Sequence, residues 1–67
     1  MEFELNGDYI ELIKLLKVTG LCQTGGEAKS VVSEELVKVD GAIETRKKRK
    51  VRKGQLVEFA GKQVKVI

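Results

Sequence analysis

The sequence predicts an α+β fold in which two short N-terminal helices pack on a small, mostly antiparallel β-sheet. Apolar residues recur at helical spacing in the first half of the chain and at every second position after Leu36. The dipeptides Asp40-Gly41 and Gly61-Lys62 indicate tight turns between the alternating segments. Helices followed by a run of strands are typical of α+β domains. Because the 67 residues include no proline and no low-complexity linker, we expect residues 1–67 to form a single domain.

The N-terminal residues predict a strand followed by a helix. Residues 3–5 alternate between apolar and acidic side chains, as in a short N-terminal edge strand. Asp8 and Glu11 have the spacing of an N-cap pair, so the first helix is expected to begin near Tyr9. Gly20 is a typical helix stop. The leucines and isoleucines between these limits cover more than half of the helix circumference, which indicates a heavily buried helix.

A second helix is predicted directly after the first. Thr24 and Glu27 have the spacing of a capping box, and apolar residues at helical spacing follow, which predicts a helix over about residues 24–34. Cys22, the single cysteine, precedes this helix and is expected to be a small buried side chain between the two helices.

The second half of the chain predicts an antiparallel sheet. Residues 37–39 and 42–44 alternate on either side of the Asp40-Gly41 turn and form a predicted hairpin. Further strands are expected over residues 56–59 and 64–67, separated by the Gly61-Lys62 turn.

Basic residues concentrate in one segment of the chain, residues 46–53, which we call the basic segment. It holds seven of the 13 Lys and Arg residues, whereas the rest of the chain has six basic and ten acidic residues, a balance of −4. Such an asymmetry indicates an anionic partner. We expect the partner to contact all seven basic residues: Arg46, Lys47, Lys48, Arg49, Lys50, Arg52 and Lys53.

The composition of the basic segment favours nucleic acid as the partner. Lys and Arg neutralise phosphates and release condensed counterions. Val51 is the only apolar residue among the charges, whereas membrane-surface segments combine charges with exposed apolar side chains. The three aromatic residues, Phe3, Tyr9 and Phe59, are expected to pack in the core, which disfavours base stacking and favours recognition of shape and backbone. Charge alone leaves RNA, DNA and an acidic protein as alternatives.

The start of the second helix is a further candidate for phosphate contact. The backbone N–H groups of Gly25 and Gly26 could receive a phosphate there, and simple loop flexibility explains the two glycines equally well. Lys29, one turn later, could reach the same anion; an ordinary solvated helix face is the alternative.

Several classes of function are excluded by what the sequence does not contain. With no histidine and one cysteine, the chain lacks the residues of a zinc site or a thiol nucleophile with its base, so we expect no catalytic residues, metal or cofactor. No apolar run reaches the roughly 20 residues of a membrane span. The sequence therefore predicts a cytoplasmic protein that is not an enzyme and has no membrane partner.

The ordered set of motifs resembles the S4 RNA-binding domain family, also called the αL motif. The resemblance is closest to the small stand-alone bacterial members of the YbcJ/YaaA type. The residues that carry it are Leu12, Leu16, Gly20-Leu21, Thr24, Ala28-Lys29, Val32, Val37-Lys38-Val39-Asp40-Gly41 and Val51-Arg52-Lys53-Gly54-Gln55-Leu56-Val57.

The resemblance implies an RNA-binding module, and together with the basic segment it leads to our main hypothesis, a non-catalytic module that binds structured RNA, such as ribosomal or transfer RNA, mainly through phosphate contacts. Its RNA-binding surface would be formed by the two helices and the following strand loop, and would join Lys29 to the basic segment on one face. The hypothesis also allows a ribosomal or RNA-processing protein as a partner, and the chain is expected to be a monomer. The alternative is a ribosome- or complex-associated adaptor that docks an acidic protein.

The sequence departs from the family pattern at four positions. Glu11 stands where many members have Arg, Gly25 where many have Arg, Glu35 where a Gly usually ends the second helix, and Gln55 where Asp is usual. With two common basic positions absent, we expect the basic segment to contribute more of the affinity. The backbone amides of Gly25 and Gly26 could replace a missing Arg. Replacing Arg46, Lys47, Lys48 and Arg49 together by Gln is expected to weaken binding and leave the fold intact.

Overall fold

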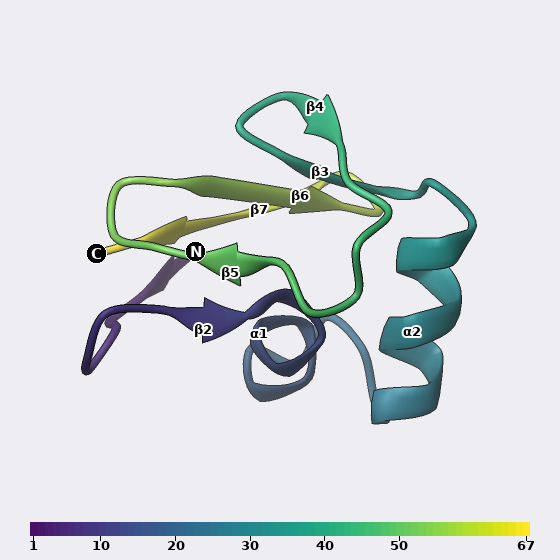
Figure 1. The fold of residues 1–67 in the computed structure, drawn as a ribbon, viewed down its shortest axis with the longest axis horizontal. Helices are drawn as coiled ribbons and strands as arrows, with labels where there is room; N and C mark the ends of the chain where they lie inside the picture. The colour runs from purple at the N-terminus through teal and green to yellow at the C-terminus, as the bar shows by residue number, and fades with distance from the viewer.

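The computed structural model describes all 67 residues and contains two helices and seven strands (Figure 1). In chain order the elements are β1 (Glu2–Phe3), β2 (Ile10–Glu11), α1 (Leu12–Val18), α2 (Gly25–Ser33), β3 (Val37–Val39), β4 (Ala42–Ile43), β5 (Lys50–Val51), β6 (Leu56–Phe59) and β7 (Lys62–Val66).

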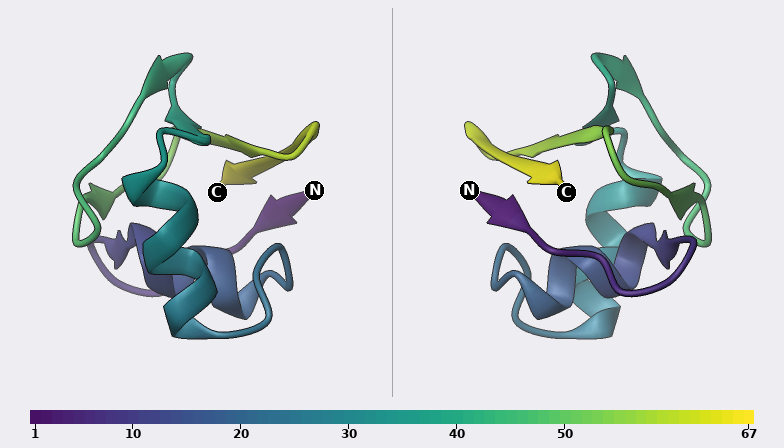
Figure 2. Two further views of the ribbon diagram at one scale, coloured as in Figure 1. Left: turned by 90° about the vertical axis from the view of Figure 1, so that its right-hand side faces the viewer. Right: turned by 90° about the vertical axis from the view of Figure 1, so that its left-hand side faces the viewer.

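Five of the strands form one sheet in the order β1-β7-β6-β3-β4, and all of its pairings are antiparallel except that of β1 with β7. The predicted N-terminal edge strand is therefore present as β1, although it spans Glu2–Phe3 rather than residues 3–5, and its pairing with β7 brings the two chain termini together. Strands β2 and β5 form a separate two-stranded antiparallel ribbon next to α1 (Figure 1). Both helices lie on the same side of the five-stranded sheet (Figure 2), which confirms the predicted α+β architecture.

The core lies between the helices and the sheet. The sheet contributes valines at alternate positions, and the helices contribute leucines, Ala28 and Val32. Cys22 is buried with them, as expected, and Phe3 and Phe59 pack against the edge of this cluster. The core residues are Leu5, Leu12, Leu15, Leu16, Cys22, Ala28, Val32, Val37, Val39, Val51, Val57, Val64 and Val66.

The predicted start of the first helix near Tyr9 is wrong. Helix α1 begins at Leu12, because the two residues before it pair with β5 instead of continuing the helix. Glu11 occupies the N-cap position, but its side chain makes no capping hydrogen bond. Pairing with β5 also buries Val51 completely, so the tertiary contact outweighs the local capping signal.

The capping box of α2 is confirmed with one change. The Thr24 hydroxyl accepts a hydrogen bond from the Glu27 N–H at 3.1 Å, as predicted. The Glu27 carboxylate accepts its bond from the N–H of Gln23, at 2.6 Å, rather than from that of Thr24. Both contacts satisfy N–H groups near the helix start, where no partner exists within the helix.

Helix α2 ends in a Schellman motif. The N–H of Leu36 donates to the carbonyl of Val31 at 3.1 Å, and the N–H of Glu35 donates to that of Val32 at 3.2 Å. This geometry places Glu35 in the left-handed region with a φ of 63°. Glu35 therefore adopts a conformation that usually requires glycine. It also places an acidic side chain at the C-terminal end of the helix, where the helix dipole is negative.

Replacing Glu35 by Gly is expected to stabilise the protein by about 0.5–1 kcal/mol. The left-handed conformation costs a non-glycine residue about 1–2 kcal/mol, and the greater freedom of glycine in the unfolded chain offsets part of the gain. Urea unfolding measures the difference. Glu34→Gly is the matched control, because Glu34 has a φ of −85° and glycine relieves nothing there. Equal stability of wild type and Glu35→Gly would contradict the explanation.

The two predicted hairpins are present, and the turn of the second lies one residue earlier than expected. Asp40 and Gly41 both have positive φ, 52° and 83°, in the turn between β3 and β4. In the second hairpin the turn residues are Ala60 and Gly61, with φ of 55° and 77°, so β7 begins at Lys62. A two-residue turn of this type needs positive φ at both central positions.

Neither helix of the fold is long and apolar enough to cross a membrane.

Candidate nucleic-acid interface

The basic segment is attached to the start of helix α1 through its backbone. The carbonyl of Arg49 accepts a hydrogen bond from the N–H of Leu12 at 2.8 Å, and the carbonyl of Lys47 accepts one from the N–H of Ile13 at 3.3 Å. These N–H groups belong to the first turn of α1, where side-chain caps normally act. The basic segment therefore caps the helix, and the helix fixes the path of the segment.

A buried carboxylate binds two of the seven basic side chains. Glu44 is only 7% exposed and lies two residues before the basic segment. Its carboxylate accepts hydrogen bonds from Nε and Nη2 of Arg46, at 2.9 and 3.0 Å, and from the backbone N–H of Arg46 at 2.9 Å. Arg49 forms a second ion pair with the same carboxylate through Nη1. The Arg46 side chain, supported by Arg49, lowers the pKa of Glu44 to about 2, although burial acts in the opposite direction.

The ion pairs of Glu44 with Arg46 and Arg49 change which cations are available to a ligand. With one carboxylate against seven cations, the local charge falls from +7 to +6. The Arg46 side chain remains 72% exposed and can still present its outer edge to solvent, whereas that of Arg49 is only 26% exposed. Three lysines of the basic segment are exposed and form no ion pair, hydrogen bond or cation–π contact through their side chains: Lys47, Lys48 and Lys53.

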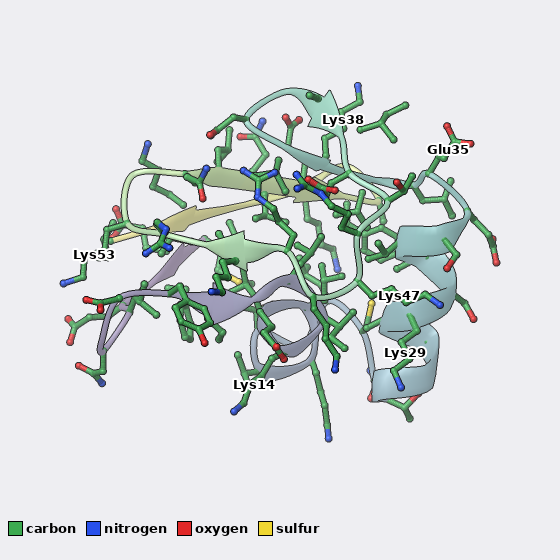
Figure 3. The ribbon with its side chains drawn as sticks, viewed as in Figure 1. Lys14, Lys29, Glu35, Lys38, Lys47 and Lys53 are labelled. Atoms are coloured by element: carbon green, nitrogen blue, oxygen red, sulfur yellow. The ribbon has the colours of Figure 1, made fainter.

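The exposed lysines are spread across the molecule. Lys47 and Lys29, which belongs to helix α2, lie on the same side of the view in Figure 3, whereas Lys53 lies at the opposite end. The basic segment also forms a concavity lined only by cationic residues, Arg46, Lys48, Arg49 and Lys50. Such a surface favours anions along its length. Lys29 thus lies on the same side of the view as Lys47, and its contact with RNA stays a prediction.

The environment of Tyr9 differs from the prediction that this ring packs in the core. Tyr9 is 43% exposed. Lys50 Nζ lies over the ring at 4.9 Å from its centroid, and Arg52 Cζ lies at 5.8 Å. The Arg52 guanidinium also donates a hydrogen bond of 3.4 Å to the Asp8 carbonyl. The ring lies beside β5 because β2, rather than a helix, follows it in the chain.

Gly25 and Gly26 are the first two residues of α2, as the sequence predicts. Their N–H groups lie in the first turn, which lacks partners within the helix. The carboxylate of Glu27 is bound beside them at the N–H of Gln23. A phosphate approaching these amides would meet this negative charge, and the role of the two glycines in phosphate contact stays a prediction.

A comparison with protein families shows which family the chain belongs to. A family model described as the S4 domain matches residues 3–67. The chain belongs to the S4 domain family. It is 49% identical over 59 residues to the "Putative RNA-binding protein YbcJ" of Escherichia coli, a match that covers 88% of this chain and 84% of that protein.

Two further comparisons support this assignment. The solution structure of Escherichia coli YbcJ superposes with a TM-score of 0.76 at 46% identity, covering 98% of this chain and 85% of that one. That structure is described as revealing an αL motif involved in RNA binding. A tyrosine–tRNA ligase of Ralstonia nicotianae is 37% identical over 62 residues, which are 92% of this chain and 16% of the ligase. The S4 resemblance and the αL fold predicted from the sequence are therefore confirmed.

Proposed function

We propose that residues 1–67 form a single, non-catalytic module of the cytoplasm that binds structured RNA, ribosomal or transfer RNA, mainly through phosphate contacts of the basic segment. The observation that carries this proposal is the exposed set Lys47, Lys48 and Lys53 on a segment whose backbone is hydrogen-bonded to α1. The RNA-binding descriptions of YbcJ and of its αL motif support RNA as the nucleic acid.

The geometry favours a phosphate-based mode of recognition. A fixed backbone with flexible lysine side chains provides point charges that can adapt to a folded RNA surface. Arg46 contributes a guanidinium already oriented by Glu44, so less side-chain freedom is lost on binding a phosphate. The remaining chain carries a net negative charge, which repels RNA from other faces and orients the encounter.

The proposal predicts steep salt dependence of RNA binding. If about four phosphates are neutralised, the slope of log K against log salt should lie near −3 to −4. Filter binding of a transfer RNA and of a ribosomal RNA hairpin at increasing salt measures the slope. Duplex DNA and polyglutamate at matched salt are the comparison ligands. Affinity for RNA that does not change between low and moderate salt would contradict phosphate recognition, and tighter binding of polyglutamate would favour a protein-docking function.

A further inference from the structure

A pocket lies next to the basic segment, on the N-terminal side of β2. Its volume is about 410 Å³, and its apolar wall consists of Phe3, Leu5, Tyr9 and Ile10. Pockets of this size accommodate small planar ligands. The Tyr9 ring lines this pocket and also makes cation–π contacts with Lys50 and Arg52. It therefore connects an apolar recess with the proposed phosphate-binding surface.

We propose that this pocket receives an unpaired RNA base that carries an amino group, stacked against Tyr9, while Lys50 and Arg52 hold the adjoining phosphate. The inference rests on the proposed RNA-binding function and adds a site for a single-stranded nucleotide to it. Bases without an amino group, such as uracil, are expected to bind less well.

The exposure of Tyr9 supports a stacking role. Only part of the ring is buried, and its hydroxyl makes no hydrogen bond within the chain, so its contribution to the core is small. Aromatic side chains bordered by cations are the usual platforms for single-stranded nucleotides, because the ring stacks on the base while the cations neutralise the phosphate. Arg52 is already held toward Tyr9 by its bond to the Asp8 carbonyl.

The polar lining of the pocket sets which part of a nucleotide can enter. Its four polar lining residues are Glu4, Asn6, Glu11 and Lys14, and none of their side chains forms an ion pair within the chain. Two carboxylates against one ammonium group leave the lining with a net charge of −1, which disfavours a phosphate, and the carboxylates accept hydrogen bonds from N–H groups. The base should therefore point inward with its amino edge toward the carboxylates, and its phosphate should remain outside with Lys50 and Arg52.

Tyr9 provides a direct optical test. It is the single tyrosine in a chain without tryptophan, so intrinsic tyrosine fluorescence reports on this ring alone. The probes are an RNA hairpin with a blunt end and the same hairpin with a three-nucleotide cytidine overhang. We expect the overhang to quench Tyr9 and to tighten binding about 5- to 150-fold, the range for stacking of a base on an aromatic side chain.

Substitutions at Tyr9 separate stacking from general affinity. Tyr9→Leu is expected to remove the gain from the overhang, measured for each protein against its own binding of the blunt hairpin, whereas Tyr9→Phe should keep most of the gain. Equal unfolding curves in urea for the three proteins establish that the fold is retained. An overhang gain that survives Tyr9→Leu would overturn the stacking role.

A uridine overhang tests the carboxylates, since cytosine and uracil have the same ring size but differ in the amino group. We expect the wild type to prefer cytidine, and the Glu4→Gln, Glu11→Gln variant to lose the preference. If the blunt hairpin binds with the predicted salt dependence but the cytidine overhang adds nothing, the pocket inference fails and the proposed function stands. If the blunt hairpin is not bound, the proposed function fails. Quenching of Tyr9 by a free cytidine trinucleotide would then support the pocket on its own, and absence of quenching would contradict it.

Discussion

Replacing Lys47, Lys48 and Lys53 together by Gln is expected to weaken binding of a structured RNA about 100-fold at roughly 0.1 M salt. These three side chains are exposed and have no partner within the chain, so each is free to neutralise a phosphate. Each lost phosphate contact removes about 0.7–0.9 from the slope of log K against log salt. The slope should therefore become less steep by about 2–3 in the triple variant.

The matched control replaces three lysines outside the basic segment, Lys17, Lys38 and Lys62, by Gln. All three are exposed, and the change in net charge is identical. Lys38 lies far from Lys47 and Lys29 in the structure (Figure 3). If binding depends on the basic segment, the control should lose little affinity. Equal losses in the two variants would mean that RNA responds only to net charge, and would contradict a localised site.

Neither triple variant is expected to change the free energy of unfolding by more than about 0.5 kcal/mol, because exposed side chains without partners contribute little to stability. Urea unfolding followed by circular dichroism provides this check. A loss of RNA binding with an unchanged unfolding curve then assigns the effect to the interface rather than to the fold.

Local sequence signals account for most of the fold. The cap of α2 and the Asp40-Gly41 hairpin depend on neighbouring residues, and both are confirmed. The start of α1 depends on pairing between residues 10–11 and 50–51, whose partners are 41 and 39 positions apart. No local pattern in Asp8–Glu11 contains that information, which is why the capping signal there was misleading. The exposure of Tyr9 follows from the same long-range pairing.

The position of Glu44 could have been predicted from the hairpin register. The two-residue turn pairs Val39 with Ala42 and Lys38 with Ile43, so the next pair is Val37 with Glu44. The N–H of Glu44 indeed donates to the Val37 carbonyl at 3.0 Å. Because Val37 faces the core, the Glu44 side chain must point inward, and a buried carboxylate requires cationic or hydrogen-bonding partners.

The ion pairs of Glu44 change the expected result of neutralising the whole basic segment. Removing Arg46 and Arg49 leaves a buried carboxylate without its two cations, so such variants lose stability as well as phosphate contacts. A loss of RNA binding in the variant that replaces Arg46, Lys47, Lys48 and Arg49 would therefore have two causes. The lysine variant avoids this ambiguity.

Replacing Arg46 and Arg49 together by Met is expected to destabilise the protein by about 3 kcal/mol or more, the cost of leaving a buried charge unpaired. A domain of this size has a total stability of only about 3–10 kcal/mol, so the double variant should be largely or partly unfolded. Adding Glu44→Gln to the double variant should restore much of the lost stability, because no buried charge then remains. Urea unfolding of the double and triple variants measures both effects, and equal stability of the two would contradict the role assigned to Glu44.

The pH dependence of stability tests the same ion pairs without removing an arginine. The pKa of Glu44 is lowered from 4.5 to about 2 in the folded protein, so its charged form stabilises the fold above the unfolded value of 4.5. This stabilisation is lost as the pH falls from 4.5 toward about 2, where the carboxylate is protonated in both states. The single variant Glu44→Gln does not titrate at this position. Wild type should therefore exceed it in stability by about 1–2 kcal/mol near neutral pH, and the difference should disappear in strong acid. A difference that stays constant across this range would show that the carboxylate charge does not hold the basic segment in place.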